Sequence, residues 1–251
     1  MDPISLFKKT KFSNTIWWQL QTKVQGFQNE LGYDLVTEIF KNRKFRLVEK
    51  DLFLKNWKFK SRILVQLFED GYLCWINIDN LLCQKWLVLD NDETNYVYDE
   101  FYIQSKIPYI LDWIKDQAKL SNKYLWGGTC GPDFDCSGLI QSAFLSQSIF
   151  LPRDSYQMKN FCKNILYSPE EINSLKMGDI LFFGSRTKCN HVGIYIQNGY
   201  YYHSSGKDTG RDGIGIDRII KPDNSISCYY LSKFIAAGRV IRSYKWNKTL
   251  R

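Results

Sequence analysis

The spacing of the hydrophobic positions changes along this chain. Between residues 13 and 31 they recur every three or four positions, the period of an amphipathic helix, and Ser13 stands where its N-cap would be. Between residues 43 and 88 the pattern changes to short aromatic and β-branched segments separated by Asn, Asp and Gly. The segments RKFRLVEKD, SRILVQLFED and GYLCWINID predict a small antiparallel barrel of about five strands.

Residues 90–100, DNDETNYVYDE, are acidic and are predicted to be a linker. From Pro108 to near Ser121 the pattern predicts a helix, with one apolar face formed by Ile110, Leu111, Ile114 and Ala118. Further on, SGLIQSAFLSQS is typical of a helix, whereas GDILFFG, HVGIYIQ and GYYYHSS are typical of strands in an antiparallel sheet. We therefore expect an α+β protein divided into a partly helical extension (1–40), a barrel with its linker (41–100) and a mixed domain (101–251).

Composition excludes several classes of protein. The chain of 251 residues is 16% aromatic, which disordered chains are not, and no stretch approaches the roughly 18 apolar residues of a membrane-spanning helix. The net charge of +8 is carried without dense basic runs, so no nucleic-acid partner is expected. The seven cysteines are an odd number and have no regular spacing, so they predict reduced thiols rather than a disulfide framework. No secretory signal is recognised, so we expect a cytoplasmic protein with no membrane association.

One of these cysteines has unusual neighbours. In YLWGGTCGPDFDCSGLI, a glycine-rich loop leads through Asp135 into Cys136 at the start of a predicted helix. A thiol in the first helical turn meets unpaired backbone N–H groups and the positive end of the helix dipole, which favour the nucleophilic thiolate. The same N–H groups could hold an oxyanion after attack on a carbonyl carbon.

The chain has only two histidines, and both lie beside this motif in the predicted sheet. His191 and His203 occupy successive strands joined by Asn198 and Gly199, a strong hairpin turn. Direct counting from the turn leaves the two histidines offset by one residue, so a bulge is needed to bring them to one face. In that case His191 would take the proton of Cys136, and His203 would fix the tautomer of His191.

The motifs YLWGG, DCSGL and LPRDSYQ, followed by MGDILFFG, HVGIYI and YYHSSG, resemble those of the NlpC family of papain-like cell-wall cysteine peptidases over roughly residues 108–243. The barrel segment resembles a bacterial SH3 domain, as in cyanobacterial-type γ-D-glutamyl-L-diamino acid endopeptidases, and HSSGKDTGRDGIGID also resembles that subgroup. The resemblance implies a papain-like C-terminal domain with helices packed on an antiparallel sheet, preceded by a small all-β SH3-like barrel. Residues 1–40 match nothing in it.

By position, the resemblance implies that Cys136 is the nucleophile, His191 the base and His203 the orienting residue, with the Tyr124 hydroxyl near the oxyanion. It implies that Asp154 binds the free α-amine of the substrate, although an ion pair between Arg153 and Asp154 is an alternative. The groove and the D-glutamate carboxylate would be met by Asp135, Ser137, Arg153 and Ser155. At the amine-binding end, the SH3-like domain would contribute Asp70 and Tyr72.

The expected reaction is hydrolysis of L-Ala-γ-D-Glu-diaminopimelate peptides before the meso-diaminopimelate, during cytoplasmic recycling of peptidoglycan, with neither cofactor nor metal. An exported autolysin and a non-catalytic module that binds wall fragments remain open. So does a zinc site formed by Cys136, Cys189, His191 and His203. The pattern predicts neither the oligomeric state nor the exact diamino acid.

Overall fold

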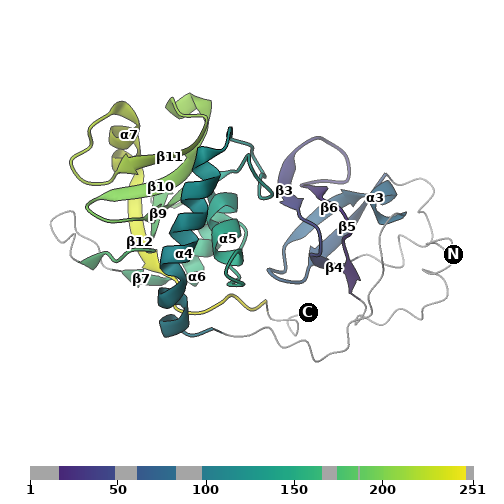
Figure 1. Cartoon of the computed structure of the whole chain (residues 1–251). Helices are drawn as coiled ribbons and strands as arrows, with labels where there is room; N and C mark the ends of the chain where they lie inside the picture. Colours follow the sequence, from purple (N-terminus) through teal and green to yellow (C-terminus); the bar gives the residue numbers. More distant parts are fainter. Residues whose placement is uncertain (1–16, 49–60, 83–97, 166–173, 186, 247–251) are drawn as a thin grey trace. The chain divides into compact units, whose positions relative to one another are not determined.

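The computed structural model describes residues 17–48, 61–82, 98–165, 174–185 and 187–246 (Figure 1). Contacts between residues divide the chain into two compact units. One comprises Met1–Asn95 together with Lys245–Arg251, and the other comprises Tyr96–Tyr244.

The N-terminal unit is built on one six-stranded antiparallel sheet with the order β1-β4-β5-β6-β2-β3. Its elements are β1 (Trp18–Gln19), β2 (Val24–Phe27), β3 (Leu35–Ile39), β4 (Lys44–Leu47), β5 (Arg62–Leu67), β6 (Leu73–Asn77) and the short helix α3 (Ile78–Leu82). The three strands predicted between residues 43 and 79 are confirmed as β4, β5 and β6. Whether this sheet is SH3-like stays a prediction.

The helix predicted over residues 13–31 is wrong in its described part, where β1 and β2 form instead. Trp18, Leu20, Val24 and Phe27 are buried in the core of the sheet. Their helix-like spacing arises because two short strands are separated by a polar bend, which sets the apolar positions three to four residues apart. The sheet therefore includes residues that were assigned to an extension over 1–40. Residues 13–16 lie outside the described ranges.

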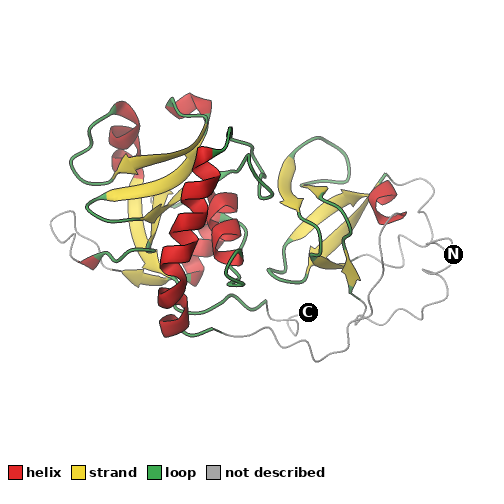
Figure 2. Cartoon of the chain, in the orientation of Figure 1, coloured by secondary structure: helices red, strands yellow, loops and turns green. Residues whose placement is uncertain are grey.

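The C-terminal unit contains a second six-stranded antiparallel sheet, with the order β11-β10-β9-β8-β12-β7 (Figures 1 and 2). Its strands are β7 (Lys163–Ile165), β8 (Ile180–Gly184), β9 (Cys189–Tyr195), β10 (Tyr200–Ser205), β11 (Gly213–Arg218) and β12 (Phe234–Arg239). Its helices are α4 (Glu100–Lys119), α5 (Cys136–Leu145), α6 (Ser155–Phe161), the 3-10 turn η3 (Lys207–Thr209) and α7 (Ser225–Lys233). This confirms the mixed helix-and-sheet class, and the predicted strands GDILFFG, HVGIYIQ and GYYYHSS form as β8, β9 and β10.

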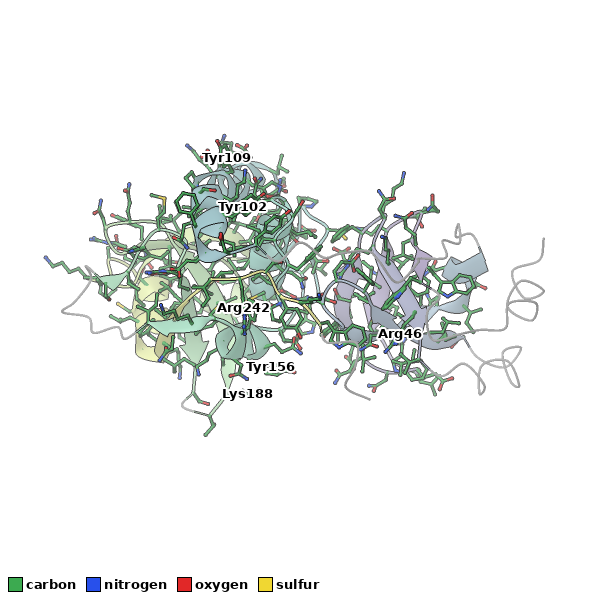
Figure 3. The ribbon with its side chains drawn as sticks, turned by 90° about the horizontal axis from the view of Figure 1, so that it is seen from below. Arg46, Tyr102, Tyr109, Tyr156, Lys188 and Arg242 are labelled. Atoms are coloured by element: carbon green, nitrogen blue, oxygen red, sulfur yellow. The ribbon has the colours of Figure 1, made fainter. Side chains whose placement is uncertain are left out.

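Helix α4 begins at Glu100, eight residues before the predicted start at Pro108. Asp99 caps it by accepting a hydrogen bond from the backbone N–H of Tyr102, so the helix starts within the acidic stretch that was predicted to be a linker. Residues 90–97 of that stretch lie outside the described ranges. Tyr109 lies on the exposed side of α4 (Figure 3).

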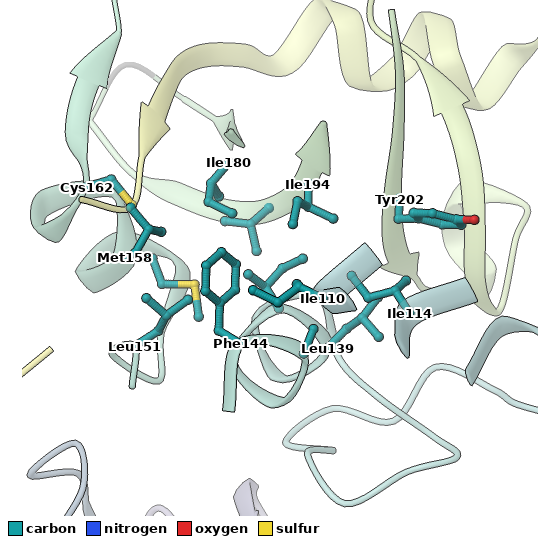
Figure 4. Packing of buried hydrophobic residues seen from close by; sticks show 14 of the residues in the cluster. Ile110, Ile114, Leu139, Phe144, Leu151, Met158, Cys162, Ile180, Ile194 and Tyr202 are labelled. Carbon is teal, nitrogen blue, oxygen red and sulfur yellow. The ribbon is translucent and has the colours of Figure 1, made fainter. Parts of the chain in front are cut away.

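The sheet of the C-terminal unit buries both of its faces. On one face, α4, α5 and α6 enclose a core whose fully buried members include Ile110, Ile114, Leu139, Phe144, Ile180 and Ile194 (Figure 4). On the other face, side chains of α7 pack with Leu181, Phe183, Tyr195 and Tyr201. No helix within the described residues is long and apolar enough to cross a membrane.

Candidate active site

Cys136 is the first residue of α5, and Asp135 is the N-cap of that helix. The Asp135 carboxylate accepts hydrogen bonds from the backbone N–H groups of Gly138 (2.6 Å) and Gly127 (2.9 Å), so it ties the glycine-rich loop to the helix. A Cβ atom at Gly138 would lie 2.0 Å from the carbonyl oxygen of Gly128. Only glycine permits this close approach, which holds Cys136 at the point where the loop becomes the helix.

Arg153 neutralises the carboxylate that caps α5. Its Nη2 lies 2.5 Å from Asp135 Oδ2, and its Nη1 donates to Ser137 Oγ over 2.9 Å. The residue is only 2% exposed, so its guanidinium is enclosed by these partners. The structure therefore joins Asp135, Ser137 and Arg153 into one buried network that supports the nucleophile.

Asp154 and Ser155 begin α6. Asp154 is the N-cap, its backbone N–H donates to Gln157 Oε1 over 3.1 Å, and its side chain is half-buried. Ser155 is buried, and its hydroxyl donates to the backbone carbonyl of Cys189 over 3.2 Å. The second residue thus links α6 to the start of strand β9, two residues before His191.

The turn between β9 and β10 shifts the pairing of the strands by one residue. Asn198 and Gly199 both have positive φ angles, 54° and 85°, as an Asn-Gly hairpin turn requires. The backbone N–H of Tyr200 donates to the carbonyl of Gln197, while the carbonyl of Tyr200 accepts from Ile196. Two residues of β9 therefore face one residue of β10, which is the bulge that the offset of the histidines required.

Because of this shift, Tyr202 pairs with Ile194, and the two histidines fall on the same face of the sheet. His191 Nε2 lies 2.9 Å from His203 Nδ1, and both side chains are buried. The predicted pairing of the two histidines is confirmed as geometry. Their roles in a reaction stay a proposal.

The hydrogen-bonded line continues to Asp217 in β11, which the sequence analysis missed. Asp217 Oδ2 lies 2.6 Å from His203 Nε2 and also accepts from Arg211 Nη2 over 2.6 Å, while Asp217 Oδ1 accepts from Ser227 Oγ over 3.0 Å. The only signal in the sequence was an acidic residue at the end of the alternating segment GIGID. Its partner became visible only once β10 and β11 were paired.

Tyr230 of α7 covers the two histidines. Its ring stacks on His191 at 4.3 Å and meets the edge of His203 at 4.8 Å. Tyr230 is three residues after Ser227, so one face of α7 presents both the ring over His191 and the hydroxyl bound to Asp217. This residue was also missed, because a tyrosine in a helix with no strong apolar pattern gives no sign of its neighbours.

Segment 134–136 enters the sheet where β9 and β10 diverge. Among the described residues these strands pair only at Tyr201 with Tyr195 and Tyr202 with Ile194. Beyond that point, Ser204 Oγ donates to the carbonyl of Phe134 over 2.6 Å, and the backbone N–H of Val192 hydrogen-bonds the thiol of Cys136. The nucleophile candidate thus contacts the residue that directly follows His191.

Tyr124 lies beside the same thiol. Its backbone bridges to Phe134, and its ring packs over Gly206. Burial raises the pKa of the Tyr124 hydroxyl, and the neighbouring Cys136 and Asp135 raise it further. The hydroxyl therefore stays protonated and can donate a hydrogen bond near Cys136.

The thiolate expected at the helix start is contradicted for the free protein. Burial raises the pKa of Cys136 to about 12, and the negative charge of Asp135 adds to this rise. The N–H groups of Val192 and Ser137 and the charge of Arg153 oppose it only in part. The helix dipole does not prevail, because the N-terminus of α5 is already occupied by a carboxylate. Cys136 is a neutral thiol at pH 7.

The two histidines are also neutral at pH 7. Burial lowers the pKa of His191 well below 6.5, and His203 lowers it further. Burial lowers the pKa of His203 as well, although Asp217 partly offsets this. For Asp217, burial would raise the pKa, but its hydrogen bond and charge interaction with His203, together with Arg211 and Ser227, bring it to about 2. The hydrogen-bonded line therefore consists of a carboxylate and two neutral imidazoles.

Asp70 and Tyr72, predicted to bind substrate, lie in the N-terminal unit. The Asp70 carboxylate is 2.9 Å from Arg43 Nη2 and accepts from the backbone N–H of Tyr72. Tyr72 is half-buried and packs on the core of its own sheet. The structure gives Asp70 a buried ion pair, and the substrate roles of both residues stay predictions.

The cysteines of the described part of the chain form no disulfide with one another. The six described cysteines are all free thiols, and Cys228 is exposed. Cys83 lies outside the described ranges.

Both ring nitrogens of His203 are engaged, by His191 and by Asp217, so neither is free for zinc. In the described part of the chain, no three His, Cys, Asp or Glu side chains are grouped to hold a metal ion.

The segment that carries these site residues matches a known protein family. The model of the NlpC/P60 family matches residues 121–224, which contain Cys136, both histidines and Asp217. Residues 121–224 are an NlpC/P60 domain. The rest of the C-terminal unit, which includes α4, α7 and β12, completes the packing around this domain.

Similar proteins include the γ-D-glutamyl-L-lysine dipeptidyl-peptidase of Bacillus subtilis (strain 168), 36% identical over 84 residues, which are 32% of this chain and 27% of that protein. The murein DD-endopeptidase MepS/murein LD-carboxypeptidase of Escherichia coli (strain K12) is 30% identical over 120 residues, 47% of this chain and 56% of that protein. The chain thus spans about a quarter to a half of these relatives.

Solved structures are more distant. An NlpC/P60 family protein from Bacillus cereus ATCC 10987 is 20% identical, with a TM-score of 0.45 over 94% of this chain and 66% of that one. NlpC2 from Trichomonas vaginalis is 15% identical, with a TM-score of 0.47 over 92% of this chain and 100% of that one.

Proposed function

We propose that this protein is a cysteine endopeptidase that hydrolyses the γ-D-glutamyl–meso-diaminopimelate bond of peptidoglycan peptides with a free N-terminal L-Ala. The observation that carries the proposal is the hydrogen-bonded pair His191–His203 beside Cys136, within an NlpC/P60 domain. The similarity to the γ-D-glutamyl-L-lysine dipeptidyl-peptidase of B. subtilis supports a γ-D-glutamyl bond as the target. The substrate is a released peptide in the cytoplasm.

In the proposed reaction, His191 Nδ1 takes the proton of the Cys136 thiol as the sulfur attacks the carbonyl carbon of the γ-D-glutamyl bond. The C–N bond then breaks, the diaminopimelate amine takes the proton from His191, and a thioester remains on Cys136. Water attacks the thioester, again with His191 as the base, and releases the γ-carboxyl product and the free thiol. The Cys136 N–H and the Tyr124 hydroxyl stabilise the oxyanion in both steps.

Because the free thiol has a pKa of about 12, the proton leaves as the substrate arrives rather than beforehand. His191 is suited to this role, since its lowered pKa leaves it uncharged and able to accept a proton at pH 7. Substrate binding that excludes water strengthens the attraction between the new thiolate and the imidazolium.

Asp154, Ser155 and Ser137 are assigned to the substrate. The half-buried carboxylate of Asp154 binds the α-ammonium of L-Ala, and Ser137 and Ser155 line the groove. For either hydroxyl to donate to the D-glutamate carboxylate, it must first turn away from its present acceptor, Asp135 Oδ1 or the Cys189 carbonyl. Arg153 and Asp135 are assigned to holding Cys136, since each neutralises the other.

The test is incubation of the full chain with L-Ala-γ-D-Glu-meso-diaminopimelate and, separately, with intact sacculi and with a peptide pair cross-linked through D-Ala. Mass spectrometry should detect L-Ala-γ-D-Glu and free diaminopimelate from the first, and Cys136→Ser should release none. Faster release from sacculi would favour an exported autolysin, and cleavage of the D-Ala cross-link alone would overturn the bond assignment. Binding without cleavage by the wild type would indicate a non-catalytic module.

A further inference from the structure

Asp217 ends the line of hydrogen bonds that runs from His191 through His203. It is buried, and its two oxygens accept from His203, Arg211 and Ser227. An ionised carboxylate can only accept hydrogen bonds. The direction of every hydrogen bond in the line therefore follows from this one group.

In each neutral imidazole one ring nitrogen donates and the other accepts, so the direction of one hydrogen bond fixes the direction of the next. Since Asp217 accepts, the proton of neutral His203 must be on Nε2, which leaves a lone pair on Nδ1. His203 Nδ1 then accepts from His191 Nε2, so neutral His191 also carries its proton on Nε2. The lone pair of His191 is consequently on Nδ1, the nitrogen that takes the thiol proton in the proposed reaction.

We propose that Asp217 is a positioning residue of this site: it sets the tautomers of His203 and His191 and so determines which nitrogen of His191 is the base. Arg211 and Ser227 hold the carboxylate ionised and oriented, so that it accepts but never supplies a proton. The catalytic consequence rests on the proposed function, whereas the tautomers do not.

The chain is well suited to a direct test, because its only two histidines are the two rings in question. In protein labelled with ¹⁵N-histidine, two-bond ¹H–¹⁵N correlation spectra at pH 7.5 report the tautomer of each ring without background. Both rings should have the Nε2–H form in the wild type. A ring with the Nδ1–H form in the wild type would overturn the proposal, whether or not any peptide is cleaved.

Two substitutions separate the role of Asp217 as a hydrogen-bond acceptor from the role of its negative charge. In Asp217→Asn, the amide oxygen should take the place of Oδ2, because Arg211 can only donate, so the tautomers are kept and kcat falls about tenfold. In Asp217→Ala, no acceptor faces His203 Nε2, so the His203 spectrum should show a mixture of tautomers and kcat should fall about 100-fold with KM little changed. Unchanged ring spectra or an unchanged kcat in the Ala variant would overturn the proposal.

Asp179→Ala is the matched control. Asp179 is also a fully buried carboxylate bound to an arginine, Arg239, in the same unit, but it touches neither histidine. This variant should lose stability comparably and keep both ring spectra and kcat. If no substrate is cleaved by the wild type, the proposed function fails while the spectra still decide the tautomers. If Asp217→Ala does not fold, the wild-type and Asn spectra remain decisive.

Discussion

Ser204 donates a hydrogen bond to the carbonyl of Phe134 over 2.6 Å, joining strand β10 to the loop that ends in Cys136. The two residues are 70 positions apart in the chain, and both are buried. Ser204 directly follows His203, and Phe134 is two residues before Cys136. One bond therefore connects the strand of the orienting histidine to the loop of the nucleophile.

Ser204→Ala should lower the free energy of unfolding by about 1–3 kcal/mol, because it leaves the buried carbonyl of Phe134 with only the long hydrogen bond from the Leu125 N–H, at 3.4 Å. It should also lower kcat more than it raises KM, since the distance between Cys136 and the histidines is then less well defined. Urea denaturation and steady-state kinetics measure the two effects. Ser232→Ala, which removes an exposed hydroxyl on α7, is the control and should change neither.

Cys136 should react slowly with iodoacetamide in the free protein. Alkylation requires the thiolate, and burial holds the pKa of this thiol at about 12. Its rate, followed by peptide mass spectrometry, should rise about tenfold per pH unit from pH 6 to pH 9. Exposed Cys228 should be modified first. A rate for Cys136 that is constant across neutral pH would show a preformed thiolate–imidazolium pair instead.

The buried histidines should make the protein sensitive to mild acid. Their pKa values are lowered on folding, so the unfolded chain binds protons that the folded one excludes as the pH falls below about 6.5. Stability is then full above that pH and should fall by up to about 1.4 kcal/mol per pH unit for each histidine. Urea unfolding between pH 7.5 and pH 5 gives the slope. His191→Asn should reduce it, and a flat profile would contradict the burial of neutral rings.

Breaking the pair beneath the nucleophile should be costly. Arg153→Met leaves the carboxylate of Asp135 buried without its partner, which typically costs about 3–5 kcal/mol. Thermal denaturation should show a large fall in Tm. Lys119→Met, which removes the exposed partner of Asp116 on α4, should leave Tm nearly unchanged. Equal effects of the two variants would mean that Arg153 does not support α5.

Substrate choice should depend on Asp154. If its carboxylate binds the α-ammonium of L-Ala, acetylating that amine removes the charge that the carboxylate binds, a loss of about 2–5 kcal/mol or roughly 30- to several-thousand-fold in kcat/KM. Asp154→Asn should cleave the free peptide more slowly and narrow the gap between the two peptides. Competition between the free and the acetylated peptide, carried out with the wild type and with Asp154→Asn, gives the ratio of their kcat/KM values for each enzyme. Equal cleavage of both by the wild type would remove Asp154 from substrate recognition.

Much of the C-terminal unit could be predicted from local pattern. The glycine-rich loop, Asp135 and the apolar face of α5 are determined within a dozen residues, so they predicted a helix beginning at Cys136. The alternating strands and the Asn198–Gly199 turn likewise depend on near neighbours. The sequence thereby determined the nucleophile candidate and both histidines, because turns and caps are short-range interactions.

Tertiary structure alone decided three things. The segment around Val24 became strand rather than helix, because a sheet partner, Ile39, outweighed the local period. The tautomers of the histidine pair depend on Asp217, which the pairing of β10 with β11 brings to His203. The protonation of Cys136 depends on burial and on Asp135 at the helix start, and these outweigh the helix dipole that local reasoning had favoured. Each depends on contacts between distant residues and on the exclusion of water, which a one-dimensional pattern does not contain.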